Sequence, residues 1–220
     1  MPPARLTWEP EVTDFLLNTF VTLLVVRDPV GLVPVYIGLT TSATKAERRV
    51  MALRGVGIAA LVLLAFSLGG QALLGALGVG LPAFRIAGGL LLFLLAMDMI
   101  LARQTGARSA TDQEQDEARQ HKDISVFPLA IPLIAGPGAM TSLLLLMGRA
   151  GDDPLLLLSL FGLLLLVLGL CLIALLFSGH LMRMLGITGS NVVSRVLGII
   201  LAALAVQFVL DGIRGSGLVS

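Results

Sequence analysis

The chain has 220 residues, a formal net charge of +1, 56% hydrophobic residues and only 13% charged residues. Soluble domains usually carry about 25% charged residues, so this composition, with a mean hydropathy of +0.96, excludes an ordinary soluble enzyme and indicates an integral membrane protein. The near-zero net charge gives no reason to expect a nucleic-acid partner. The single cysteine, Cys171, excludes a disulfide framework.

Six apolar segments predict six membrane-spanning helices. A helix needs about 20 apolar residues to cross roughly 30 Å of hydrocarbon. The segments that meet this length are residues 14–40, 55–75, 81–101, 124–148, 155–179 and 192–212. The N-terminal residues lack the basic stretch and cleavage site of a removable signal peptide, so we expect the first span to remain in the mature protein.

A polar stretch divides the spans into two halves. Residues 103–123 predict an exposed cytoplasmic loop between a first three-helix unit, residues 1–102, and a second, residues 124–220. Of the lysines and arginines outside the spans, ten lie in the first-to-second, third-to-fourth and fifth-to-sixth loops, and four lie elsewhere. The positive-inside rule places these three loops in the cytoplasm and both termini outside it.

The two halves share a sequence pattern. "VRDPVG" in the first span and "IAGPGA" in the fourth place Pro29 and Pro137 108 residues apart, and "FRIAGG" and "SRVLGI" place Gly88 and Gly198 110 residues apart. Such an offset predicts a duplicated three-span unit, whose second copy enters the membrane inverted because three is odd. Chance remains the alternative, since Gly and Pro are common in membrane helices.

The first span carries charges near the bilayer centre. Arg27 and Asp28 would each cost about 2.5 to 3.5 kcal/mol there even on the milder insertion scales. Pro29 lacks an N–H but suits the first position of a helix, so Asp28 is expected to be the N-cap of a half-helix that begins at Pro29. Arg27 could be a counter-ion for Asp28 or contact a solute carboxylate, and the alternative is that the two charges only neutralise each other inside the bundle.

The fourth span carries a matching break without a carboxylate. Gly136 and Pro137 have the same relation as Asp28 and Pro29, and a helix N-terminus with free N–H groups favours an anion. We therefore expect an external carboxylate near Gly138, with the hydroxyls of Thr141 and Ser142 in support and a solute ammonium group at Asp28. Alternatively, these two hydroxyls bond their own helix backbone.

The remaining candidates lie outside these two turns. Gln207 is expected to make an interhelical hydrogen bond or to touch the solute, and Gly198, Ala202 and Ala205 share a helical face suited to close packing. No residue pattern predicts a metal site, a cofactor or a catalytic group. The predicted solute-binding residues are Arg27, Asp28, Pro29, Gly31, Gly136, Pro137, Gly138, Thr141, Ser142 and Gln207.

Four stretches of the chain resemble one family. These are "RDPVGLVP", "FRIAGGLLLFLLAMDMI", "FPLAIPLIAGPGAMTS" and "SRVLGIILAALAVQFVLDGI", which together resemble the MarC family of six-span bacterial inner-membrane proteins. The resemblance implies a multi-pass plasma-membrane protein grouped with small neutral amino acid transporters. The family commonly has D-P-x-G-N in the first span, and this chain has Leu32 in place of the asparagine.

The predicted fold is an all-α membrane protein of six spans in two inverted three-helix repeats, with the first and fourth spans broken near the midplane. The predicted function is secondary transport of a small solute, a neutral amino acid, by alternating access. The candidate coupling ions are a proton and a sodium ion. The alternative is a non-transporting membrane scaffold or assembly partner. An enzyme is not expected, because the central carboxylate has no catalytic partner in the pattern.

Overall fold

The computed structural model describes residues 10–101 and 123–217, and this part of the chain is all helical, as predicted. The predicted polar loop, residues 103–123, lies outside the described residues except for Asp123. The helices in chain order are α1 Pro10–Arg27, α2 Pro29–Leu39, α3 Lys45–Ala76, α4 Leu81–Ile100, η1 Ser125–Ile134, α6 Pro137–Ala150, α7 Pro154–Leu176 and α8 Ser178–Gly215.

These helices supply five segments long and apolar enough to cross a membrane, or six when a bent pair is counted as one span. The first segment joins α1 and α2 as Val12–Leu39, and the bent pair is η1 with α6, which meet at 51°. η1 is irregular because its backbone is extended at Phe127 and Ile131. The chain is therefore a multi-pass membrane protein by the length and composition of its helices.

Two predicted boundaries were wrong. α3 begins at Lys45 and not at residue 55, because Thr44 and Glu47 form a reciprocal capping box that starts the helix among polar residues. α8 begins at Ser178 and not at residue 192, and it turns at Gly186, where φ is 64°. Hydropathy finds the apolar core of a helix and misses its polar first turns.

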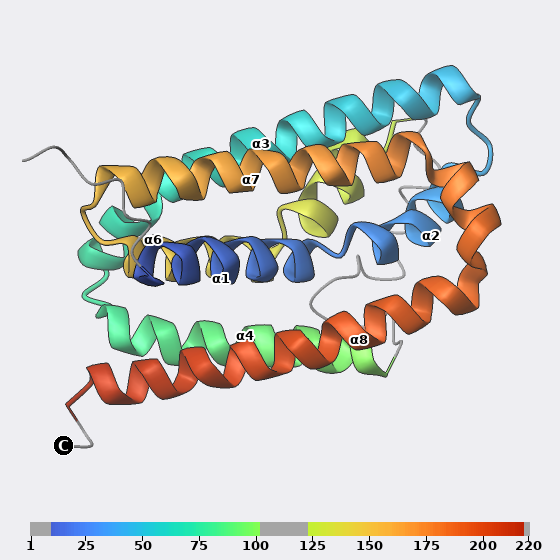
Figure 1. The fold of residues 1–220 in the computed structure, drawn as a ribbon. Helices are drawn as coiled ribbons and strands as arrows, with labels where there is room; N and C mark the ends of the chain where they lie inside the picture. Colours follow the sequence, from blue (N-terminus) through green and yellow to red (C-terminus); the bar gives the residue numbers. More distant parts are fainter. Residues whose placement is uncertain (1–9, 102–122, 218–220) are drawn as a thin grey trace, which may run out of the picture.

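The helices form three layers (Figure 1). α3 and α7 lie on one side, α4 and α8 lie on the other, and α1, α2, η1 and α6 lie between them. The start of α1 and the end of α8 lie at one end of the molecule, and the turn from α2 to α3 lies at the opposite end. The middle layer is therefore shielded on both sides by apolar helices.

Burial follows from these layers. In α6 the four consecutive leucines Leu143–Leu146 are all buried, because neighbours surround the helix. In α7 several leucines are exposed, including Leu158 and Leu165, while Leu164 and Leu168 are buried. A helix that is apolar on every face but buried on only one suits contact with lipid.

α4 and α8 pack against each other through glycines in an antiparallel arrangement. A Cβ atom on Gly89 would lie 2.8 Å from the backbone oxygen of Ala205, and one on Gly212 would lie 2.8 Å from that of Pro82. A Cβ atom on Gly198 would lie 2.9 Å from Met99 Cβ. The predicted close-packing role of Gly198 is confirmed, since glycine here lets the two helix backbones approach.

Replacing Gly89 with valine is expected to separate α4 from α8 and to destabilise the fold by about 2 to 4 kcal/mol. This is the upper part of the range for overpacked sites, because the added side chain meets helix backbone. The control is Gly162→Val in α7, where an added Cβ meets nothing within 4 Å. Both variants share the intrinsic helix propensity change, so the difference in unfolding free energy, measured by detergent denaturation, reports the packing alone. Equal stability of the two variants would contradict the packing.

Candidate functional site

The start of α2 is built by Asp28. This residue is the N-cap of α2, its backbone is left-handed with φ 41° and ψ 71°, and its Oδ1 atom accepts a hydrogen bond of 2.9 Å from the N–H of Gly31. Aspartate is one of the few non-glycine residues that adopt this conformation readily. The predicted N-cap, with Pro29 at the first helical position, is confirmed.

Gly31 makes room for the Asp28 carboxylate. A Cβ atom on Gly31 would lie 2.1 Å from Asp28 Oδ2 and 2.5 Å from the hydroxyl oxygen of Ser194. No side chain can therefore occupy position 31 while the carboxylate keeps this place. The structure gives Gly31 a steric role at the site.

α8 supplies a second hydrogen bond to Asp28. The hydroxyl of Ser194 donates to Asp28 Oδ2 at 2.7 Å, so each carboxylate oxygen accepts a bond from within the protein. Asp28 is only 1% exposed, and these donors compensate the burial of its charge. The sequence prediction missed Ser194, which lies 166 residues from Asp28.

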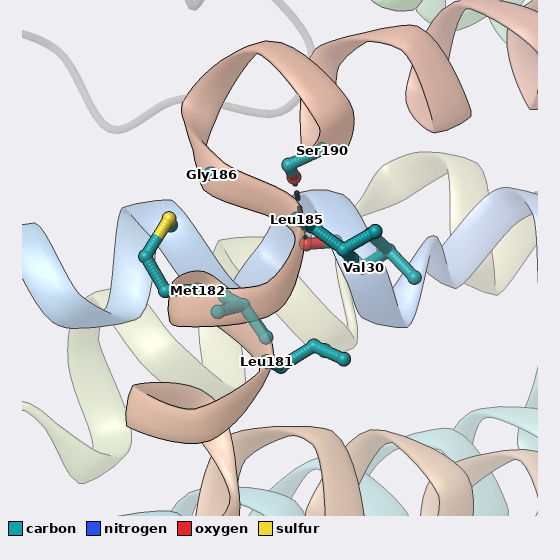
Figure 2. Close-up of a pocket in the computed structure, with 7 residues that line it drawn as sticks. Val30, Leu181, Met182, Leu185, Gly186 and Ser190 are labelled. Carbon is teal, nitrogen blue, oxygen red and sulfur yellow. Dashed lines mark hydrogen bonds between the residues drawn. The ribbon is translucent and has the colours of Figure 1, made fainter.

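One turn earlier on α8, Ser190 bonds the backbone of α2 (Figure 2). Its hydroxyl donates to the carbonyl oxygen of Val30 at 3.1 Å, beside the turn of α8 at Gly186. Pro34 lies four residues after Val30 inside α2 and has no N–H to donate to that carbonyl. Ser190 therefore completes the backbone hydrogen bonding that Pro34 interrupts. The four-residue spacing of Ser190 and Ser194, which places both on one helical face, was the available signal.

Arg27 is buried in the same region. It is 1% exposed, and its Nη1 atom donates to the carbonyl oxygen of Leu23, one turn earlier in α1, at 3.2 Å. The guanidinium thus reaches back along α1, whereas the carboxylate of Asp28 reaches forward to α2 and α8.

The start of α6 differs as predicted. Gly136 is its N-cap with an extended backbone, Pro137 follows, and no side chain caps the helix. A Cβ atom on Gly136 would lie 2.2 Å from the backbone oxygen of Pro132. One on Gly138 would lie 2.9 Å from Leu95 Cδ2 and 4.0 Å from Val26 Cγ1. Glycine at both positions therefore lets the turn pack directly against its neighbours.

A small cavity adjoins this turn. It is large enough for about one water molecule. The cavity is lined by Val26, Leu95, Pro132, Leu133, Ile134, Gly136, Gly138 and Ala139. Because Val26 stands two residues before Asp28, the end of α1 meets the start of α6 at this cavity.

The two predicted hydroxyls of α6 are buried. Ser142 is 0% exposed and donates to the carbonyl oxygen of Ala139 at 2.9 Å, which is the backbone bond considered as the alternative. Thr141 directs its Cγ2 methyl group toward Gly88 of α4, 2.4 Å from where a Cβ atom would lie. Both residues therefore contribute to packing at the start of α6.

Gln207 does not join these residues. It is exposed on α8, and its Nε2 atom donates to Asp211 Oδ1 at 2.7 Å. Asp211 also forms an ion pair of 2.5 Å with Arg149, whose guanidinium lies 4.6 Å from the ring centre of Phe208. Gln207 belongs to this polar cluster, which links the end of α6 to the end of α8.

Comparison with known proteins gives a consistent result. The family described as "MarC family integral membrane protein" matches residues 13–216. A UPF0056 membrane protein of Methanocaldococcus jannaschii is 37% identical, over 92% of this chain and 98% of its own. UPF0056 membrane proteins of Escherichia coli (YhcE) and Bacillus subtilis (YvbG) are 35% and 31% identical, over 89% and 92% of this chain and 90% and 95% of their own. No solved structure matches. The chain belongs to the MarC family of integral membrane proteins.

Proposed function

We propose that this protein is a secondary transporter that moves a small zwitterionic solute, a neutral amino acid, across the bacterial plasma membrane by alternating access. The observation that carries the proposal is a pair of helix starts, at Pro29 and Pro137, in the shielded middle layer, where the end of α1 meets the start of α6. A helix that starts inside a membrane leaves backbone groups that only protein, water or a solute can satisfy. In this proposal the first and fourth spans are broken at these points.

The two starts differ in charge in a way that fits a zwitterion. Asp28 supplies a carboxylate that can receive an ammonium group, whereas the uncapped start of α6 suits a carboxylate. Both oxygens of Asp28 already accept bonds from Gly31 and Ser194. Solute binding would therefore replace the bond from Ser194, and the described arrangement corresponds to a closed state.

The layer arrangement supports an inverted repeat. α3 lies beside α7, α4 lies beside α8, and α1 with α2 shares the middle layer with η1 and α6 (Figure 1). This is the pairing expected if each half contributes one broken span and two packing helices. In the same proposal both termini lie outside the cytoplasm, and a proton or sodium ion drives the transport.

Uptake of L-alanine into proteoliposomes tests the proposal. The Asp28→Asn variant keeps a residue that tolerates left-handed backbone but removes the charge, and Gly138→Leu blocks the start of α6. We expect either change to lower uptake about 10- to 100-fold, the effect of losing one charged hydrogen bond or the turn itself. The matched control Gly162→Leu, which faces open space, should keep wild-type uptake.

Normal uptake by both site variants would show that the site is misplaced. A non-transporting scaffold is the second candidate, because the protein itself already satisfies both carboxylate oxygens of Asp28. The scaffold is favoured if no amino acid in a panel raises the melting temperature of the purified protein while a stable partner co-purifies with it. A melting temperature that rises with one amino acid favours transport.

A further inference from the structure

Two threonines of α1 are buried without hydrogen bonds to their hydroxyls. Thr19 and Thr22 are both 0% exposed, and the Oγ1 atom of each has no hydrogen-bond partner within the described part of the chain. A threonine in a membrane helix usually donates to the carbonyl one turn earlier. A buried hydroxyl that makes no bond costs free energy, so these two oxygens call for a partner outside the helix.

The position of Val26 shows where these hydroxyls lie. Thr19, Thr22 and Val26 are spaced three and four residues apart, so they share one face of α1. Val26 lines the cavity at the start of α6, and its Cγ1 atom is 4.0 Å from the Cβ position of Gly138. The face that carries the two threonines is thus the one that meets the start of α6.

The directions of α1 and α6 show which residues of α6 lie level with Thr22 and Thr19. α1 runs toward the centre of the molecule and α6 runs from the centre back to the end where α1 begins (Figure 1). One turn back from Val26 therefore places Thr22 at the level of Ser142, one turn forward from Gly138. Thr19 lies one further turn toward that end of the molecule.

We propose that the hydroxyls of Thr22 and Thr19 line the path by which the solute reaches the start of α6 from the end of the molecule where α1 begins. The inference rests on the proposed transport function and adds two residues to it. Hydroxyls suit this place because each can donate to a carboxylate and accept from water as the solute passes. The uncapped N–H groups at the start of α6, one turn further along this path, then receive the solute carboxylate.

Valine and serine substitutions separate this role from a structural one. Thr22→Val keeps the shape and removes the hydroxyl, and Thr22→Ser keeps the hydroxyl. If the Thr22 hydroxyl meets the solute on this path, Thr22→Val raises the KM for L-alanine uptake about tenfold while the melting temperature stays equal or rises, and Thr22→Ser retains a KM near wild type. Wild-type uptake by Thr22→Val would overturn the inference.

Thiol labelling gives a readout that does not depend on transport. In a Cys171→Ala background, which removes the single native cysteine, the Thr22→Cys thiol should react with a charged methanethiosulfonate reagent, and L-alanine should slow the reaction. The matched control Val25→Cys, 1% exposed on a different face of α1, should stay unreactive. Equal, slow labelling of both thiols would overturn the path.

The two failures can be told apart. If wild-type protein transports L-alanine but the Thr22→Cys thiol is inert and Thr22→Val transports normally, only the path is wrong. If wild-type protein transports no amino acid and the Thr22→Cys thiol still reacts, the path stands and the proposed solute is wrong.

Discussion

Replacing Gly31 with alanine is expected to lower the free energy of unfolding by about 2 to 4 kcal/mol, the sum of a lost N-cap and local overpacking. The added Cβ would lie 2.1 Å from Asp28 Oδ2 and 2.5 Å from the Ser194 hydroxyl, so the carboxylate must leave both of its donors. α2 then loses its cap, and α8 loses its bond to Asp28. Denaturation of the purified protein in detergent measures the loss, and L-alanine uptake should fall with it.

Gly38→Ala is the matched control, because it lies in the same helix. A Cβ on Gly38 meets nothing within 4 Å, so alanine there should be neutral or stabilise α2 by up to about 1 kcal/mol through helix propensity. The carboxylate position would be contradicted if Gly31→Ala matched Gly38→Ala in stability. It would also be contradicted if Ser194→Ala had no effect on stability while Gly31→Ala had a large one.

The helix starts could be predicted from local chemistry. Pro29 and Pro137 cannot donate an N–H and suit the first turn of a helix, and the residue before each can serve as N-cap. These rules involve residues a few positions apart, so the sequence alone located both starts. The same holds for the apolar spans, because the length of an apolar segment is a local property.

The groups that hold Asp28 could not be predicted in this way. Ser194 and Ser190 reach α2 from α8, and only the packing of the three layers brings them there. The sequence predicted that Gly31 contacts the solute. Its steric role could not be predicted, because the collision of a Cβ at position 31 with the carboxylate depends on the rotamer of Asp28. Gln207 has the right chemistry for a site, but its helix position directs it to Asp211.

Helix boundaries show the same limit. α8 continues through Gly186 to Ser178 over residues that are too polar for a hydropathy window, and its bend brings Ser190 to the carbonyl that Pro34 leaves without a donor. Ser190 of α8 donates to this carbonyl only because the helices pack together in the folded protein, so the compensation for Pro34 cannot be found from either helix alone. It explains why an additional proline is tolerated inside the short helix that forms one side of the candidate site.

Replacing Gly136 with serine tests whether N-cap preference or tertiary packing decides which residue fits at the start of α6. Serine is among the best N-cap residues, so capping preference alone predicts a small gain in stability. The Cβ of any side chain at this position would lie 2.2 Å from the backbone oxygen of Pro132, which cannot rotate away as a flexible side chain could. We therefore expect Gly136→Ser to lower the free energy of unfolding by about 2 to 4 kcal/mol and to abolish L-alanine uptake.

Gly80→Ser supplies the matched control for this change. Gly80 is the N-cap of α4, has the same extended backbone, is likewise followed by a proline in the first turn and lacks a side-chain cap. Its Cβ would meet only Pro82 Cδ at 3.7 Å, an ordinary contact. Serine at position 80 should therefore leave the free energy of unfolding unchanged or raise it by about 0.3 kcal/mol. Denaturation of the two variants in parallel shows whether capping or steric contact dominates at Gly136. If both serines stabilise the protein, the capping preference dominates, and the close contact between Gly136 and the backbone oxygen of Pro132 is contradicted.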